Sequence, residues 1–239
     1  MSQLLYGRNP VLVALKGKKK PSRILISNTM KDRKIYEEAV KVGLKPELVS
    51  NKTLDQLSNF KNHQGVLCYM PEFQYTPLEK LLSEMKDRTD SILLMLDGVE
   101  DPVNFGSLIR TSSCFGVDGI IIPKNRQVQL TPTVSKVATG AEETLPIVQV
   151  TNLSQTIAKL KEAGYWVVAA DGKGDRLYDE IDYRGKIVII IGSEGRGISQ
   201  LVLKNSDFVA RIPIQGEITS LNAAISGALF IAMAVSKRK

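Results

Sequence analysis

The stretch that decides the fold is Ile187-Val-Ile-Ile-Ile191, which leads directly into Gly192-Ser-Glu194-Gly195-Arg-Gly197. An unbroken run of β-branched residues predicts a strand that is buried on both faces, as in a parallel sheet covered by helices. Similar apolar runs occur at Ile92–Leu96, Gly119–Ile122 and Trp166–Ala170. Because helical patterns separate these runs, the sequence predicts an α/β fold with a parallel sheet.

Two further polar motifs follow apolar runs elsewhere in the chain. Asn104-Phe-Gly106-Ser-Leu-Ile-Arg110 comes after Ile92–Leu96, and Ser220-Leu221-Asn222 comes after Ile212-Pro213-Ile214. The carboxyl ends of parallel strands share one edge of the sheet, where such folds bind ligands. We therefore predict that the three motifs form one composite site.

Each motif also has a purely structural explanation. Asn104 fits the N-cap of a helix over Phe105–Phe115, and Ser220 fits the N-cap of an apolar helix over Leu221–Val235. The glycines around Glu194 fit a tight turn as well as a close approach of a ligand to the backbone. Neither a G-x-G-x-x-G dinucleotide fingerprint nor a P-loop is present, which argues against a nucleotide-binding oxidoreductase.

The positive charge is concentrated in the first third of the chain. Residues 1–70 contain 13 Lys and Arg against five Asp and Glu, whereas residues 71–239 contain 19 against 20. This asymmetry indicates a polyanion-binding module joined to a neutral one, although a solubilising surface would have the same charge. We predict a domain over residues 1–70, a linker over 71–90 and a second domain over 91–239.

Other classes of protein are disfavoured by composition. The single histidine, His63, lies in the basic segment, so we expect no metal site, and we expect this side chain to contact RNA or solvent. Cys68 and Cys114 lack a disulfide framework and predict reduced thiols in a cytoplasmic protein. No signal peptide or bilayer-length apolar segment is evident, so we expect no membrane association. Trp166 is expected in the core.

Taken together, the motifs resemble the three signatures of the SPOUT superfamily of RNA methyltransferases, in particular its SpoU/TrmH branch of 2′-O-ribose methyltransferases. They occur in the same order within residues 91–239, and Leu130–Val134 with Gly140-Ala141 resembles the middle segment of that branch. Tyr6–Pro10 and Asn62–Gly65 resemble the small α/β L30e-like substrate-binding domain of the 23S rRNA guanosine 2′-O-methyltransferases.

This resemblance implies properties that spacing alone does not predict. The second domain would form a deep trefoil knot, bind S-adenosyl-L-methionine and act as a homodimer whose site the partner chain completes. The cofactor would be held by Gly192, Ile212 and Leu221, with Thr139, Gly140 and Ile214 nearby. Arg110 would be catalytic, with support from Asn104, Glu194, Ser220 and Asn222.

We therefore expect an enzyme that uses S-adenosyl-L-methionine to methylate the 2′-oxygen of a guanosine ribose in 23S rRNA. A tRNA 2′-O-ribose methyltransferase and a non-catalytic RNA-binding protein of the same fold are the alternatives. The polar residues of all three motifs are intact, which favours an enzyme because a binding protein does not need them.

Overall fold

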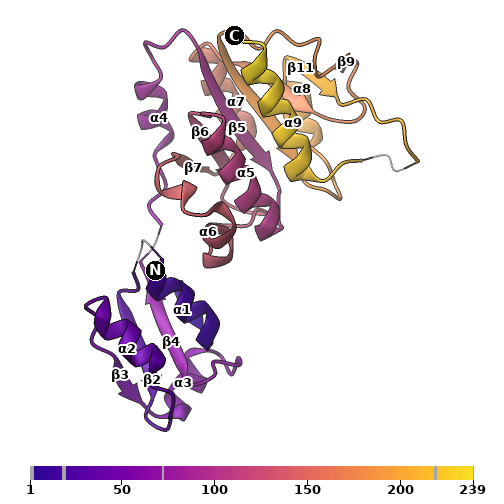
Figure 1. Cartoon of the computed structure of the whole chain (residues 1–239). Helices are drawn as coiled ribbons and strands as arrows, with labels where there is room; N and C mark the ends of the chain where they lie inside the picture. Colours follow the sequence, from indigo (N-terminus) through magenta and orange to yellow (C-terminus); the bar gives the residue numbers. More distant parts are fainter. Residues whose placement is uncertain (1–2, 18–19, 72, 218–219, 239) are drawn as a thin grey trace. The chain divides into compact units, whose positions relative to one another are not determined.

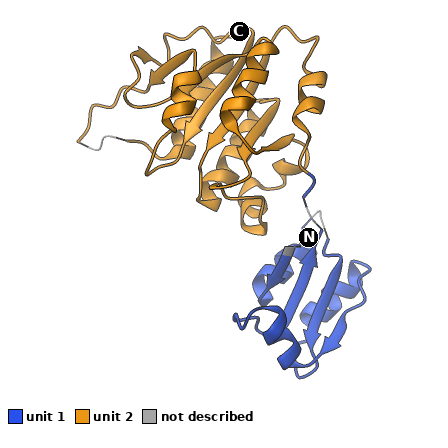
Figure 2. Cartoon of the chain, turned by 180° about the vertical axis from the view of Figure 1, so that it is seen from behind, with its two compact units in different colours: residues 1–74 blue, residues 75–239 orange. Residues whose placement is uncertain are grey.

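The chain divides into two units, residues 1–74 and residues 75–239 (Figure 2). The computed structural model describes residues 3–17, 20–71, 73–217 and 220–238. The predicted linker over 71–90 is wrong in its second part, because helix α4 (Leu78–Glu84) belongs to the second unit. Its Leu78 and Leu81 are buried in that unit's core, since an apolar helix face needs a partner.

The first unit is a four-stranded sheet with helices on both faces (Figure 1). The strand order is β1-β4-β2-β3; β4 is antiparallel to both its neighbours, and β2 is parallel to β3. Its elements are β1 (Gln3–Tyr6), α1 (Arg8–Lys16), β2 (Arg23–Ser27), α2 (Lys34–Lys41), β3 (Glu47–Val49), α3 (Asn51–Leu57) and β4 (Val66–Met70).

Alternation along the strands gives this unit two small cores. Ile24, Ile26 and Val66 pack with α1 and α2 on one face, whereas Leu25 and Leu67 pack with Leu54 of α3 on the other. Successive side chains of a strand point to opposite faces, so one sheet supplies both cores.

The two cysteines lie in different environments. Cys68 of β4 is buried and Cys114 at the end of α5 is exposed, and both are free thiols. Burial raises the pKa of the Cys68 thiol to about 12 because the thiolate would be poorly solvated. Cys68 therefore stays neutral and acts as a small apolar core residue.

The second unit contains the predicted parallel sheet, which is confirmed. Seven strands run in the order β7-β6-β5-β10-β8-β11-β9, and every neighbouring pair is parallel. The strands are β5 (Ser91–Asp97), β6 (Gly119–Pro123), β7 (Ile147–Val150), β8 (Trp166–Ala170), β9 (Arg176–Leu177), β10 (Lys186–Gly192) and β11 (Phe208–Arg211).

Helices cover both faces of this sheet. Helices α4, α7 (Leu153–Glu162) and α8 (Gln200–Asn205) share one core with the strands, while α5 (Pro102–Cys114) and α9 (Ala223–Ser236) lie on the other face (Figure 1). Asn152 caps α7 as predicted, its side chain accepting the Gln155 backbone N–H. No helix in the described ranges has the length and hydropathy to cross a bilayer.

Two predicted helix starts are wrong by two or three residues. Asp101, not Asn104, caps α5, and its carboxylate accepts the Asn104 backbone N–H at 2.9 Å. Asn222, not Ser220, caps α9 by accepting the N–H groups of Ala224 and Ile225. Asp and Asn are good N-caps, so more than one position in each segment satisfied the capping rule.

Trp166 is not a core residue, contrary to expectation. Its side chain is 55% exposed and its ring lies 5.9 Å from that of Phe208. Tyr165, Val167 and Ala169 face the core that contains α7, so Trp166, at the amino end of β8, points to the opposite face of the strand.

Glycines allow the helices of this unit to pack closely. A Cβ atom on Gly106 of α5 would lie 2.6 Å from Val137 Cβ and 2.8 Å from the Val134 carbonyl oxygen of α6 (Pro132–Ala138). A Cβ on Gly227 of α9 would collide with the buried side chain of Leu108. Gly106 and Gly227 therefore permit close packing of helices within the chain.

We predict that Gly106→Ala destabilises the second unit by about 1–2 kcal/mol, because overpacking against α6 backbone outweighs the gain in helix propensity. Urea unfolding followed by the fluorescence of Trp166, the single tryptophan, measures it. Gly172→Ala is the control, since a Cβ there meets no atom within 4 Å. Equal midpoints for both variants would contradict this account of α5–α6 packing.

Candidate active site

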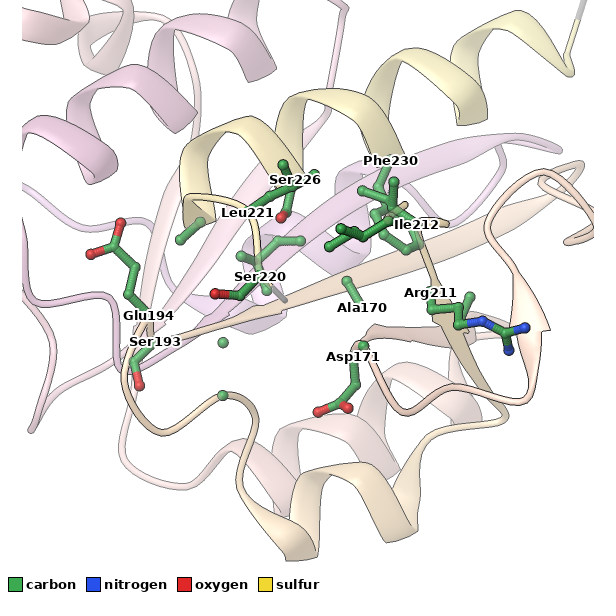
Figure 3. Close-up of a pocket in the computed structure, with 17 residues that line it drawn as sticks. Ala170, Asp171, Ser193, Glu194, Arg211, Ile212, Ser220, Leu221, Ser226 and Phe230 are labelled. Carbon is green, nitrogen blue, oxygen red and sulfur yellow. The ribbon is translucent and has the colours of Figure 1, made fainter. Parts of the chain in front are cut away.

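The carboxyl ends of three neighbouring strands surround a cavity. Gly192 ends β10, Ala170 ends β8 and Arg211 ends β11, and all three line a cavity of about 180 Å³ (Figure 3). The strands are parallel, so their ends lie at one edge of the sheet, as the sequence predicted. The last wall comes from residues 220–230, which bring the third motif and the start of α9 to the same cavity.

The segment after β10 is a tight hairpin. Ser193 and Gly197 pair through two backbone hydrogen bonds of 3.2 and 2.9 Å, and Gly197 adopts a left-handed φ of +66°. A Cβ on Gly192 would collide with the Gly197 backbone. Because Gly192 has no side chain, the backbone of Gly197 can lie directly against it. The hairpin then presents Glu194, Gly195 and Arg196 at its tip.

Residues from the three motifs meet at the Glu194 carboxylate. Asn104 Nδ2 donates to Glu194 Oε1 at 2.6 Å, and Asn222 Nδ2 donates to the same oxygen at 2.6 Å. Asn222 Nδ2 also lies 3.0 Å from Asn104 Oδ1. These short charge-assisted bonds join α5, the β10 hairpin and the start of α9 into one polar cluster.

Both asparagines are held by their helices. Asn222 uses its Oδ1 to cap α9, which leaves its Nδ2 for Glu194. Asn104 lies in the first turn of α5, where its backbone N–H is bonded to Asp101 and its side chain is almost fully buried. The capping residues therefore fix the direction of both amides toward the carboxylate.

The cavity lining is both apolar and polar. Ile212, Leu221 and Phe230 contribute apolar side chains, and Ser193, Glu194, Ser220 and Asp171 contribute polar groups (Figure 3). Ile214 adds to the apolar lining. Such a site suits a flat apolar ring with a polar or charged tail.

A second cavity of about 290 Å³ lies on the other side of Glu194. It is lined by residues 98–101, Asn104 and the hairpin residues Ser193 to Arg196. Arg196 forms an exposed ion pair with Glu100 at 2.6 Å at its rim. Glu194, Ser193 and Ala223 border both cavities, so the polar cluster lies between two spaces that a ligand pair could occupy.

Most of the predicted site residues come together here. Gly192, Ile212, Ile214, Leu221 and Ser220 line the first cavity, and Asn104, Glu194 and Asn222 form the cluster.

Three predicted residues lie elsewhere. Thr139 and Gly140 line neither cavity but form a left-handed turn, with φ of +56° and +88°, between α6 and a short 3-10 helix. Arg110 is exposed on α5, about 120° around the helix axis and about 9 Å along it from Asn104. Arg110 is thus not part of the cluster within one chain.

His63 has a structural environment rather than an open one. It is buried; its Nε2 lies 3.0 Å from Asp55 Oδ1, and its Nδ1 accepts the Gly65 N–H at 2.9 Å. The expected contact of this side chain with RNA or solvent is therefore wrong.

Asp171, which was not among the predicted site residues, also lines the first cavity. It follows β8 directly, as Gly192 ends β10, so the strand-end rule applied to Trp166–Ala170 would have included it. Among the residues that the structure describes, no group of three or more His, Cys, Asp or Glu is arranged to hold a metal ion.

Each of the two units of the chain matches a family of known proteins. The SpoU rRNA methylase family matches residues 91–232, and the substrate-binding domain of RNA 2′-O ribose methyltransferases matches residues 4–76. A protein of Staphylococcus saprophyticus assigned to the TrmH family of tRNA/rRNA methyltransferases is 38% identical over 98% of this chain and 96% of its own length.

Solved structures share the fold over nearly the whole chain. The SpoU methyltransferase AviRb from Streptomyces viridochromogenes, in complex with AdoMet, has a TM-score of 0.71 at 22% identity and covers 99% of this chain and 90% of its own. An AdoMet-bound rRNA methyltransferase from Sinorhizobium meliloti has a TM-score of 0.67 at 26% identity and covers 98% and 86%. The chain therefore belongs to the SpoU rRNA methylase family, within the SpoU/TrmH branch of RNA 2′-O-methyltransferases.

Proposed function

We propose that this protein transfers a methyl group from S-adenosyl-L-methionine to the 2′-oxygen of a guanosine ribose in 23S rRNA. The observation that carries the proposal is the convergence of three motifs on Glu194 between two cavities. The first cavity would hold the cofactor, and the second would admit the target ribose. Glu194 and the two asparagines lie where the two ligands would meet.

The first cavity fits the cofactor in its chemistry. The apolar wall of Ile212, Ile214 and Leu221 suits the adenine ring, and the backbone groups of these residues suit its polar edge. The carboxylates of Asp171 and Glu194 border the same space and suit a cationic ligand. When bound, S-adenosyl-L-methionine supplies a methyl group on a positively charged sulfur.

The residues of the chain would then align the acceptor and stabilise its developing charge. The ribose 2′-oxygen forms a bond to the methyl carbon as the carbon–sulfur bond breaks, and the hydroxyl proton leaves. Asn104 and Asn222 hold Glu194 through one oxygen, so its other oxygen is available to orient the ribose or Arg110. This positioning lowers the entropic part of the barrier.

Arg110 would stabilise the 2′-oxygen rather than remove its proton. An arginine keeps its proton in proteins because the delocalised guanidinium is a very weak acid, so it is a poor general base. We assign it a contact to the 2′-oxygen and a neighbouring phosphate, with the phosphate or water as the proton acceptor. Ser220 borders the cofactor cavity and would support the same step.

We further propose that Arg110 acts in a homodimer. Arg110 and Val103 are seven residues apart and share one exposed face of α5, on which Val103 is 52% exposed. Ile225, also 52% exposed, and Leu229 form an exposed apolar strip at i and i+4 on α9, which packs on α5. A second copy covering these side chains would bring Arg110 of the partner subunit to the cluster.

The strand order supports a deep trefoil knot in the second unit. The chain builds outward from β5 to β7, crosses to β8 and β9 on the other side of β5, and then returns to insert β10 between β5 and β8. It later returns again, so that Asn222 reaches Glu194. We propose that the chain enters the loop closed by the preceding segments after β11, over residues 211–217. The free cysteines and the RNA substrate favour a cytoplasmic location.

Ribosomal RNA is preferred over tRNA because of the first unit. Nearly all of it matches a substrate-binding domain, and it carries the excess positive charge of the chain. The rRNA methyltransferase of Sinorhizobium meliloti is similar over both units. A tRNA substrate would keep the site and its mechanism and change only the partner RNA.

We predict that the protein transfers label from methyl-labelled S-adenosyl-L-methionine to transcribed 23S rRNA fragments and not to unmodified tRNA. Arg110→Ala should abolish the transfer but not cofactor binding, because the cofactor cavity does not contain this residue. Label in tRNA alone would overturn the substrate. Absence of label in both, with the cofactor bound, would overturn the enzymatic assignment for these RNAs.

The proposed homodimer predicts that two inactive variants restore activity when they are combined in one dimer. Arg110→Ala and Glu194→Ala homodimers should both be inactive, whereas the heterodimer, co-expressed with two different tags, should regain up to half of wild-type turnover. One of its two sites combines an intact Glu194 with an intact Arg110 of the other chain. If Arg110 acts within its own chain, both heterodimer sites stay defective and no activity returns.

We also predict that Arg110→Lys lowers kcat/KM by about 100-fold, because the planar guanidinium that contacts two oxygens at once is lost. Steady-state methylation kinetics measure this change. Arg184→Lys is the matched control, since Arg184 is exposed and paired with Asp182 on the surface. Near-wild-type turnover of Arg110→Lys would show that positive charge alone suffices.

A further inference from the structure

One end of the first unit gathers three chain segments at the edge of its sheet. Tyr6 ends β1 opposite Leu67, and Ile26 near the end of β2 lies opposite Val66 at the start of β4. The loop before β4, residues 59–64, therefore lies beside the start of α1 and the loop after β2. Gln64 Oε1 accepts the Arg8 backbone N–H at 3.0 Å and connects two of these segments.

This 59–64 loop presents an aromatic side chain to solvent. Phe60 is 80% exposed, more than any other large hydrophobic residue among those that the structure describes. Phe60 and Asn59 both adopt left-handed backbone conformations, with φ of +58° and +51°. Two successive non-glycine residues in this region are unfavourable, so the surrounding structure must impose them.

The imposed conformation comes from buried polar residues beneath the loop. Ser58 Oγ lies 3.2 Å from the carbonyl oxygens of Asp55 and Lys61, and the Phe60 N–H donates to Asp55 O at 2.7 Å. His63 binds the Asp55 carboxylate on one side and the Gly65 N–H on the other. The loop is therefore held in a conformation in which Phe60 contributes little to the core.

The surroundings of Phe60 carry a positive charge. Lys61 is exposed and its Nζ lies 5.7 Å from the centre of the Tyr6 ring, and Arg8 lies beside Gln64. Lys31 and Arg33 are exposed on the loop after β2. Of the nearby carboxylates, Asp55 binds His63 and Asp32 lies 3.6 Å from Arg8. The basic groups thus outnumber the acidic ones around an aromatic ring.

We propose that Phe60 is a stacking platform for an unpaired base of the substrate RNA, with Arg8 and Lys61 contacting the adjacent phosphates. Aromatic side chains within a basic surface bind single-stranded segments in this way, because every base has a face that can stack. A loop backbone that is fixed before binding loses little entropy when the ring stacks. The proposal rests on RNA being the substrate of the second unit and locates the contact that recognises it.

A tryptophan at position 60 tests the stacking directly. The chain has a single tryptophan, Trp166 in the other unit, so F60W in a W166F background places the one fluorophore in the loop. Transcribed 23S rRNA fragments, unmodified tRNA and a fully paired RNA duplex serve as probes. Each RNA carries a dye so that anisotropy measures binding separately from tryptophan quenching.

We expect RNAs with unpaired bases to quench the tryptophan as they bind, and the duplex to bind without quenching. Binding of the folded RNAs with unchanged fluorescence would overturn the stacking role while leaving the proposed function intact. If no RNA binds while methyl-labelled S-adenosyl-L-methionine is retained, both the stacking role and the RNA substrate are wrong.

Point variants in the otherwise native chain separate stacking from charge. F60L should weaken RNA binding about tenfold without changing the slope of log Kd against log salt. K61A should reduce that slope by about one, because one phosphate contact is lost. L48A, which removes an exposed apolar side chain from β3, is the control and should bind like the native chain. Equal binding by F60L and L48A would contradict the proposal.

Discussion

The second unit depends on a carboxylate oxygen that receives two amide donors. Glu194 Oε1 accepts from Asn104 and from Asn222, and these residues come from three segments separated by 90 and 28 positions in the chain. A carboxylate with two short donors is a strong and directional junction. It orients the start of α5, the hairpin after β10 and the start of α9 at the carboxyl edge of the sheet, and both cavities border it.

Close helix packing keeps this junction in place. Gly106 lets α5 approach the backbone of α6, and Gly227 lets α9 approach Leu108 of α5. The same two helices leave Val103, Ile225 and Arg110 exposed on their outer faces. The inner faces therefore build the polar cluster, whereas the outer faces form the surface on which we propose that a second copy docks.

The two units divide binding and chemistry between them. The first unit has small cores, a large positive charge and a loop that is held in an unfavourable conformation around an exposed ring. The second has a larger core and a nearly neutral composition, with its polar groups gathered at one edge. The substrate-binding domain thus provides a basic surface, and the methylase domain provides a polar site at the edge of a large core.

The sequence by itself determined the α/β class, the parallel sheet and the place of the site, because continuous apolar strands must be buried on both faces and their ends must share an edge. The motif residues around Gly192, Glu194 and Leu221 were predictable for the same reason. Only the tertiary structure decided that Asn222 caps a helix whereas Asn104 does not, and that both bind Glu194, since either residue fits an N-cap in the sequence. It also decided that His63 is buried and Arg110 faces outward, because these depend on contacts between segments that no local pattern records.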